Sequence, residues 1–337
     1  MGKRAVKAEK AWVGIDVSAA TVEVALEDDQ GGRRELAAPN TAAGHRALCR
    51  VLAMAAREVF VCVEATGIYH FDLALALQGA KRVHVMVANP RATKDFARAT
   101  MQRAKTDRVD ARMLREFAKR MPFQGWAPPP PRVLALRALA RRIEALTEAR
   151  GQEVNRLHAA GVSAHLGPTL QKASRAHIRF LDASMEALGA EAKALIAAEP
   201  ILARRFAQLV SVRGIGERSA VRLLAELAVL PADMTVRQWV AHCGLDPRPW
   251  DSGRSIHRPA RISRTGNARL RAALYMPALV AIRCDAHVRR FHDALLARNK
   301  KPMQAIVAVM RKMLHAIYGM FANDETYDPG KCYRVAA

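Results

Sequence analysis

The segment WVGIDVSAATVEVALED (residues 12–28) carries the clearest structural signal in the first part of the chain. WVGIDVS and TVEVALED are both rich in β-branched residues, and a short polar turn separates them. This pattern predicts two antiparallel β-strands. Asp16 interrupts the apolar residues of the first strand. Because burying an unpaired carboxylate is costly, an acid at this position usually indicates a metal ion or another partner.

The following residues extend this strand pair into an α/β domain. Helical patterns are expected at 44–56 and 70–80, and further strands at 33–39, 59–66 and 83–89. The order strand–strand–strand–helix–strand–helix–strand is typical of α/β proteins. Pro90 ends the last strand, and two more helical segments are expected, the second within RAKTDRVDARMLREFAKR (103–120).

Four consecutive prolines in WAPPPPRV (126–133) mark a domain boundary, because they can continue neither a helix nor a sheet ladder. We therefore expect an α/β domain at 1–125, a helical spacer at 126–200 and a mostly helical domain at 201–330. In the spacer, apolar residues at spacings of three, four and three indicate a short coiled-coil seam: Leu136, Leu139, Ile143 and Leu146. The spacer is either a dimerisation arm or part of a helical bundle.

The composition points to a polyanionic partner. The 337 residues include 54 Lys and Arg against 31 Asp and Glu, a formal net charge of +23. A nucleic-acid backbone is the usual partner of such a surface. The five cysteines are scattered and form no CxxC pair, which favours reduced thiols over a zinc site. No apolar run has the length of a membrane span, so we expect a cytoplasmic, nucleoid-associated bacterial protein without a membrane partner.

Four acids form a candidate metal site. Asp107 and Asp110 are three residues apart, which places them on one face of a helix, and Thr106 is a suitable N-cap. Alone, such a pair is more often structural than catalytic, because the helix dipole and neighbouring arginines both favour acids in a first turn. Asp16 and Glu64 lie within or at the end of apolar strands, which strengthens the case for a site. Four carboxylates suit Mg²⁺ or Mn²⁺, and two such ions about 3.5–4 Å apart can promote phosphodiester cleavage.

A second candidate site lies in the last third of the chain. VRGIGERSA (212–220) is typical of a helix-hairpin-helix, in which Gly214 and Gly216 let backbone N–H groups approach a phosphate and Arg213 adds a charge. An ordinary turn between helices explains the same residues.

Downstream, one long basic loop, CGLDPRPWDSGRSIHRPARISRTGN (243–267), contains Ser252 within Asp-Ser-Gly, which is also ordinary turn chemistry. The arginines of this loop and of the following helix either bind phosphates or form a solvated face. They are Arg248, Arg254, Arg258, Arg261, Arg264 and Arg269.

Four ordered segments resemble the N-terminal domain of DEDD transposases of the insertion-sequence one-ten and eleven-eleven family. They are GIDVSAATVEVAL (14–26), VEATGIYH (63–70), VMVANPRATKDFARA (85–99) and AKTDRVDARMLREFA (104–118). The resemblance implies an RNase H-like (RuvC-like) mixed-sheet domain. It also implies that Asp16, Glu64, Asp107 and Asp110 are catalytic and bind the metal.

The segment 243–275 also resembles this family. The resemblance implies that Ser252 attacks the scissile phosphate and becomes covalently joined to DNA, in an enzyme that excises and inserts its own mobile element. It further implies a homo-oligomer, a dimer or tetramer, and guidance by a non-coding bridge RNA. Two other hypotheses stay open: a metal-dependent junction endonuclease that uses water, and a non-catalytic nucleic-acid-binding scaffold.

Overall fold

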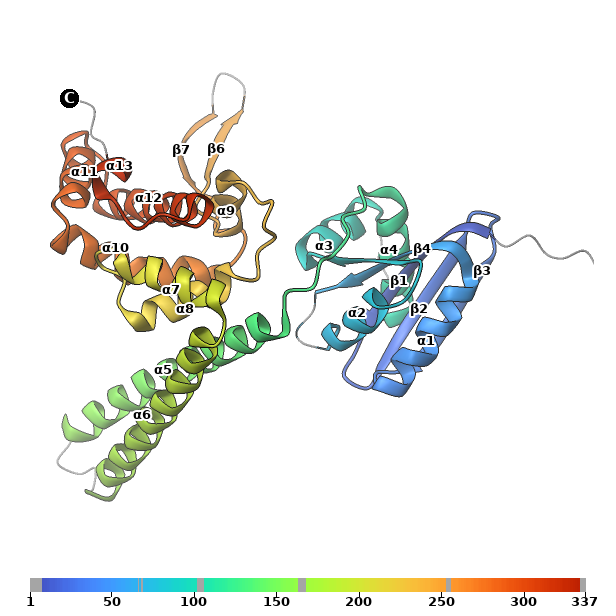
Figure 1. The fold of residues 1–337 in the computed structure, drawn as a ribbon, viewed down its shortest axis with the longest axis horizontal. Coiled ribbons are helices and arrows are strands. Elements are labelled where there is room, and N and C mark those ends of the chain that lie inside the picture. Colours follow the sequence, from blue (N-terminus) through green and yellow to red (C-terminus); the bar gives the residue numbers. More distant parts are fainter. Residues whose placement is uncertain are drawn as a thin grey trace, which may run out of the picture. The chain divides into compact units, whose positions relative to one another are not determined.

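The computed structural model divides the chain into two compact units, Met1–Pro128 and Pro129–Ala337, which we call unit 1 and unit 2 (Figure 1). The structure describes residues 8–65, 67, 69–101, 106–162, 168–252 and 256–333, and of 249–252 and 256–260 it describes the backbone alone.

Unit 1 is built on a five-stranded mixed sheet of order β3-β2-β1-β4-β5. The strands are β1 (Ala8–Val17), β2 (Thr21–Asp28), β3 (Arg33–Pro39), β4 (Ala56–Glu64) and β5 (Val83–Ala88). β1 pairs antiparallel with β2 and β2 with β3, whereas β1 runs parallel to β4 and β4 to β5. This arrangement confirms the α/β order and fits an RNase H-like domain.

Helices cover both faces of the sheet (Figure 1). They are α1 (Ala42–Ala55), α2 (Phe71–Gln78), α3 (Pro90–Ala99) and α4 (Asp107–Arg120). Side chains of β1 alternate between the two faces. Val13 and Ile15 belong to the core that includes Leu48 of α1 and Leu73 of α2, while Trp12 packs against the core that includes Leu114 of α4. By the same alternation, Gly14 and Asp16 belong to the α4 face.

Gly14 lets α4 approach β1 closely. A Cβ atom at this position would lie 2.0 Å from the carbonyl oxygen of Ala111 and 2.1 Å from the backbone nitrogen of Arg115. Both are backbone atoms of a packed helix, which cannot move aside as the end of a side chain can. The contact therefore requires glycine and fixes where α4 crosses β1.

Ion pairs hold the basic side of α4 to the sheet. Glu27 of β2 is 5% exposed and lies 2.7 Å from Lys119 and 3.3 Å from Arg115, measured between oxygen and nitrogen. The hydrogen bond from Lys119 lowers the pKa of the Glu27 carboxyl. Arg112 is paired with Glu35 of β3. The cations of this helix thus neutralise glutamates of the sheet.

Unit 2 is mostly helical, as expected. Its elements are α5 (Pro131–Val162), α6 (Pro168–Ala197), α7 (Pro200–Ser211), α8 (Glu217–Leu227), α9 (Val236–His242), β6 (Pro247–Ser252), β7 (Ile256–Ile262), α10 (Ala268–Cys284), α11 (Ala286–Ala297), α12 (Pro302–Asn323) and α13 (Pro329–Cys332). α5 and α6 lie side by side (Figure 1). Of the expected seam, Leu136 and Leu146 are buried, and Leu136 belongs to the core of unit 2. Packing within the chain therefore accounts for these two positions.

The prediction of one long loop at 243–267 is wrong in part. β6 and β7 form an antiparallel pair, with Pro247 opposite Ile262 and an irregularity between Arg248 and Trp250. Prolines at 247, 249 and 259 obscure the strand pattern, because proline cannot donate a ladder hydrogen bond.

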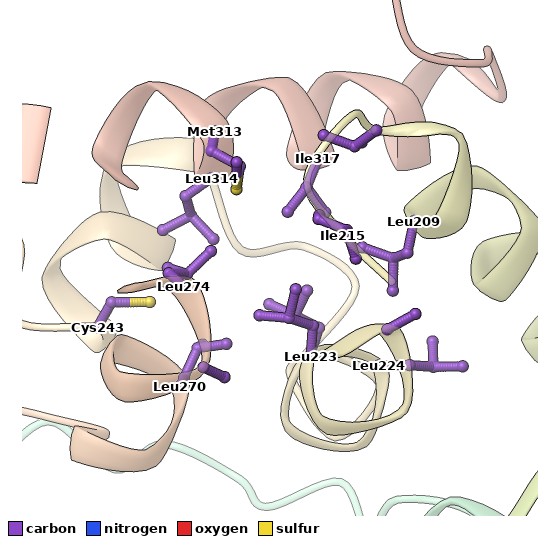
Figure 2. Packing of buried hydrophobic residues seen from close by; sticks show 14 of the residues in the cluster. Leu209, Ile215, Leu223, Leu224, Cys243, Leu270, Leu274, Met313, Leu314 and Ile317 are labelled. Carbon is purple, nitrogen blue, oxygen red and sulfur yellow. The ribbon is translucent and has the colours of Figure 1, made fainter. Parts of the chain in front are cut away.

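The core of unit 2 collects leucines and methionines from several helices (Figure 2). Leu223 and Leu224 of α8, Leu270 and Leu274 of α10, and Met313 of α12 are buried in it. Within the described residues, α12 is the one helix long and apolar enough to span a membrane. Because its apolar residues contribute to this core, burial within the protein explains that composition.

We predict that Gly14→Ala destabilises the protein by about 3 kcal/mol or more, because the new methyl group would overlap the backbone of α4. Urea unfolding of the full-length protein measures the change. Gly125→Ala is the matched control, since a Cβ there meets no atom within 4 Å. It should change stability by less than about 0.5 kcal/mol. Equal stability of the two variants would show that α4 does not require this contact.

Candidate active site

Two strands bring Asp16 and Glu64 to the same end of the sheet. β1 and β4 are parallel neighbours, and Ile15 lies opposite Val63. The next residue on each strand is an acid, Asp16 or Glu64. Both acids are one step past this register pair and belong to the face covered by α3 and α4. The observed register therefore brings the two strand acids close together.

Helix α4 contributes the other two acids from its first turn. Thr106 caps this helix, and its side chain accepts a hydrogen bond from the backbone nitrogen of Val109 at 3.3 Å. Asp107 and Asp110 then occupy the turn in which the helix dipole favours negative charge. Because Gly14 fixes the crossing of α4 over β1 at Ala111, this first turn lies near the end of β1.

The four acids interact electrostatically. The pKa of Asp16 is raised from 3.8 to about 6, first by burial and then by the charges of Asp110 and Asp107, with a smaller contribution from Glu64. The three other acids thus all act on Asp16. Within the described residues, however, no three His, Cys, Asp or Glu side chains already form a group that could hold a metal ion.

The chemistry of this donor set fits a divalent cation. All four candidate ligands are carboxylates, the hard oxygen ligands that Mg²⁺ and Mn²⁺ prefer. Burial is the main cause of the raised pKa of Asp16, and the negative charges of the other acids add to it; a bound cation would offset these charges. Closing the group around an ion requires side-chain movement from the described positions.

The neighbouring arginines have partners in the sheet. Arg108 lies 3.7 Å from a carboxylate oxygen of Glu23, and Arg112 is bonded to Glu35 through two nitrogens. These contacts weaken the interpretation that the acids of α4 serve only to balance arginines of the same helix. Arg103, the third arginine nearby, lies outside the described residues.

Two supporting side chains were not found from the sequence. Thr93 donates a hydrogen bond to Glu64 at 2.6 Å. Asn40 donates through its side-chain nitrogen to the carbonyl oxygens of Ser18 at 2.8 Å and Tyr69 at 3.2 Å, so it joins the segments that follow β1 and β4. Nε2 of His45 is hydrogen-bonded to Oδ1 of Asn40 at 2.7 Å. Thr93 lies within the segment 85–99 that resembles the transposase family, but the sequence of this segment indicates no partner for its hydroxyl.

In unit 2, the glycines of VRGIGERSA have different surroundings. Gly214 has a φ of +103°, and a Cβ there would lie 2.6 Å from the carbonyl oxygen of Pro277 in α10. It is therefore needed for packing between helices. Gly216 is the N-cap of α8, and a Cβ there would meet no atom within 4 Å. Arg213 donates to the carbonyl oxygen of Cys284 at 3.4 Å. A phosphate-binding helix-hairpin-helix stays a prediction.

The β6–β7 hairpin carries the predicted nucleophile. The backbone of Ser252 ends β6 opposite Ile256, and its side chain lies outside the described residues. The side chain of Arg258 and all of Arg254 also lie outside them. The remaining predicted phosphate-binding arginines are exposed: Arg248, Arg261, Arg264 and Arg269. Of these, Arg269 is ion-paired with Glu144 of α5.

Comparison with known protein families identifies both units. The model of the DEDD transposases of IS110 matches residues 13–162, and the model of the transposase IS116/IS110/IS902 family matches residues 207–293. The chain belongs to the IS110 family of transposases. The first match includes all four acids and the second includes Ser252. Membership of this family makes the chain an enzyme that acts on DNA.

Relatives of this IS110-family transposase include a pilin gene-inverting protein of Moraxella bovis. It is 27% identical over 268 residues, which cover 79% of this chain and 81% of that protein. The 43.6 kDa protein of insertion element IS110 of Streptomyces coelicolor is 29% identical over 142 residues, 42% of this chain and 34% of the relative. The 42 kDa protein of insertion element IS900 of Mycobacterium paratuberculosis is 37% identical over 89 residues, 26% of this chain and 21% of the relative.

We predict that Asp16→Asn makes this transposase more stable in metal-free buffer at pH 7–8. The folded-state pKa of Asp16, about 6, exceeds the ordinary value of 3.8. The stability of the wild type therefore falls as pH rises from 3.8 to about 6, and the full loss of stability is present above pH 6. The full shift corresponds to roughly 3 kcal/mol, which solvent screening of this half-exposed group reduces to about 1 kcal/mol.

Urea unfolding at pH 4 and pH 8 measures this difference. The gain from Asp16→Asn should be present at pH 8 and absent at pH 4. Asp233→Asn, at an exposed position in unit 2, is the control for removing one negative charge. A stability gain that is the same at both pH values would contradict a raised pKa at Asp16.

Proposed function

We propose that this transposase excises and inserts a mobile element by cutting and rejoining DNA strands at a site that requires a divalent cation. The supporting observation is the gathering of Glu64, Asp107 and Asp110 around Asp16, on three elements whose positions are fixed by strand register and by Gly14. Like charges held around a half-buried carboxylate are costly, and phosphodiester chemistry gives a reason for keeping them.

Each acid has a defined part in this proposal. Asp16 and Glu64 would hold Mg²⁺ or Mn²⁺ from the strand ends, and Asp107 and Asp110 from the first turn of α4. A bound cation of this kind supplies activation of the attacking oxygen and stabilisation of the leaving oxygen. Above pH 6 Asp16 is mainly ionised even before a cation binds, so its oxygens are available as ligands.

We further propose that Ser252 is the nucleophile. Its hydroxyl oxygen forms a bond to the scissile phosphorus as the bond from that phosphorus to a deoxyribose oxygen breaks. The serine proton is lost, and the released deoxyribose oxygen takes up a proton. Attack by a free DNA hydroxyl on the same phosphorus then restores the serine and joins the strands. The exposed Arg248, Arg261 and Arg264 of the hairpin region support phosphate binding beside this residue.

The partners in this proposal are the element ends, the target DNA and a non-coding bridge RNA, bound by a homo-oligomer. The formal charge of +23 supports nucleic-acid partners in general. Family membership supports DNA in particular. The bridge RNA and the dimer or tetramer rest on the resemblance described for the sequence.

Replacement of Ser252 tests the covalent step. Full-length protein is incubated with labelled element-end DNA and Mg²⁺, and a DNA-linked protein band is sought under denaturing conditions. We expect Ser252→Ala to lose this band and strand rejoining entirely, while Ser255→Ala, the control three residues away, retains both. If Ser252→Ala still forms the adduct, Ser252 is not the nucleophile. Cleavage without any adduct in the wild type would instead favour a water-using endonuclease.

Replacement of the acids tests the cation site in the same assay. We expect Asp16→Asn, Glu64→Gln, Asp107→Asn and Asp110→Asn each to lower cleavage by at least about 100-fold, because each removes one anionic ligand. Asp95→Asn is the control, since Asp95 lies on α3 in exposed ion pairs with Arg91 and Arg98. Unchanged DNA processing by Asp16→Asn with Mg²⁺ present would support a binding scaffold and contradict the proposal.

A further inference from the structure

Helix α3 buries a polar residue beside the candidate active site. Every residue of α3 is described, and among them Thr93 alone is buried, with 0% of its surface exposed. Threonine at a fully buried helical position requires a partner for its hydroxyl group. An alanine or valine would fill such a position without this requirement. Packing therefore does not explain the hydroxyl group, and its hydrogen-bond acceptor indicates its role.

The hydroxyl of Thr93 has two neighbours within hydrogen-bond distance. Its oxygen lies 2.6 Å from Oε2 of Glu64 and 3.0 Å from the carbonyl oxygen of Pro90. The hydroxyl carries one proton and donates it to one acceptor at a time. A distance of 2.6 Å is typical of donation from a hydroxyl to an ionised carboxylate, which is the stronger of the two bonds. The Glu64 carboxylate is therefore the favoured acceptor.

The elements around Thr93 hold it in place over Glu64. Ala88, the last residue of β5, lies opposite Glu64 in the parallel pair, and α3 begins two residues later at Pro90. Asn89 caps this helix by accepting from the backbone nitrogen of Arg91 at 2.9 Å. The short connection brings the first turn of α3 back over the end of β4.

Helix α3 is also joined to the helix that carries the other two acids. The rings of Phe96 in α3 and Phe117 in α4 meet edge to face, with centroids 5.3 Å apart. Both rings pack in the core on this face of the sheet. The position of Thr93 is thus fixed from β5 on one side and from α4 on the other, which is the rigid support that a precise hydrogen bond needs.

We propose that Thr93 is a positioning residue, whose hydroxyl orients the Glu64 carboxylate toward the divalent cation. This inference rests on the proposed function, because it assumes that Glu64 is a ligand. Groups that bond to metal ligands restrict the orientation in which the ligand presents its oxygens. Thr93 would act in this way on one of the two strand acids, with no contact of its own to the cation or to DNA.

Titration of Mn²⁺ into the full-length protein, followed by calorimetry, tests the role of the hydroxyl. Thr93→Val keeps the shape of the side chain without the hydroxyl, and Thr93→Ser keeps the hydroxyl with less bulk. We expect Thr93→Val to weaken Mn²⁺ binding by about 10–100-fold and Thr93→Ser to stay within about threefold of the wild type. Thr93→Ala provides a second comparison, since it differs from Thr93→Ser by the oxygen alone. Comparison of Thr93→Ser with Thr93→Ala therefore tests the role of the hydroxyl even if Thr93→Val does not fold.

The outcomes separate this inference from the proposed function. Equal Mn²⁺ affinity of the serine and alanine variants would overturn the positioning role of Thr93. If Glu64→Gln loses Mn²⁺ binding in the same experiment, the proposed cation site stands whatever the result at Thr93. If Glu64→Gln binds Mn²⁺ like the wild type, Glu64 is not a ligand, and both proposals fail at this residue.

Discussion

The close contact between β1 and α4 at Gly14 is the constraint on which the candidate active site depends. It puts backbone against backbone, so the position of the helix is set by atoms that cannot adjust. Asp16 lies two residues along the strand from Gly14, and Asp110 precedes Ala111 at the contact itself. A side chain at position 14 would push the first turn of α4 away from the end of β1.

Electrostatics explains why so basic a protein can keep four acids together. Four of the cations on α4 are paired with Glu23, Glu27 and Glu35 of the sheet, which attaches the helix along its length. The acids of the first turn act on Asp16, whose pKa is raised first by burial and further by their negative charges. The arrangement costs stability in the absence of a cation, which is common where structure is kept for function. In an IS110-family transposase, the proposed cation site would give a functional reason for that cost.

Much of unit 1 could be predicted because its signals are local. Alternating β-branched residues revealed the strands, and Thr106 marked the start of α4 as observed. The contacts of Thr93 and Asn40 could not be predicted, because their partners are 22 or 29 residues away in the chain and become neighbours only through the sheet order. The β6–β7 hairpin was missed because its prolines hide the strand pattern. The close approach of Gly214 to Pro277 could not be predicted either, because it depends on how α10 packs.

The location of a bound cation in the folded protein would test the proposed cation site at these four acids. Crystals of the full-length transposase grown with Mn²⁺ can be measured at a wavelength where manganese scatters anomalously. We predict an anomalous peak within coordination distance of Asp16 and Glu64 and of at least one of Asp107 and Asp110. A manganese peak that contacts none of these four carboxylates, or no peak beside them at saturating Mn²⁺, would contradict the account.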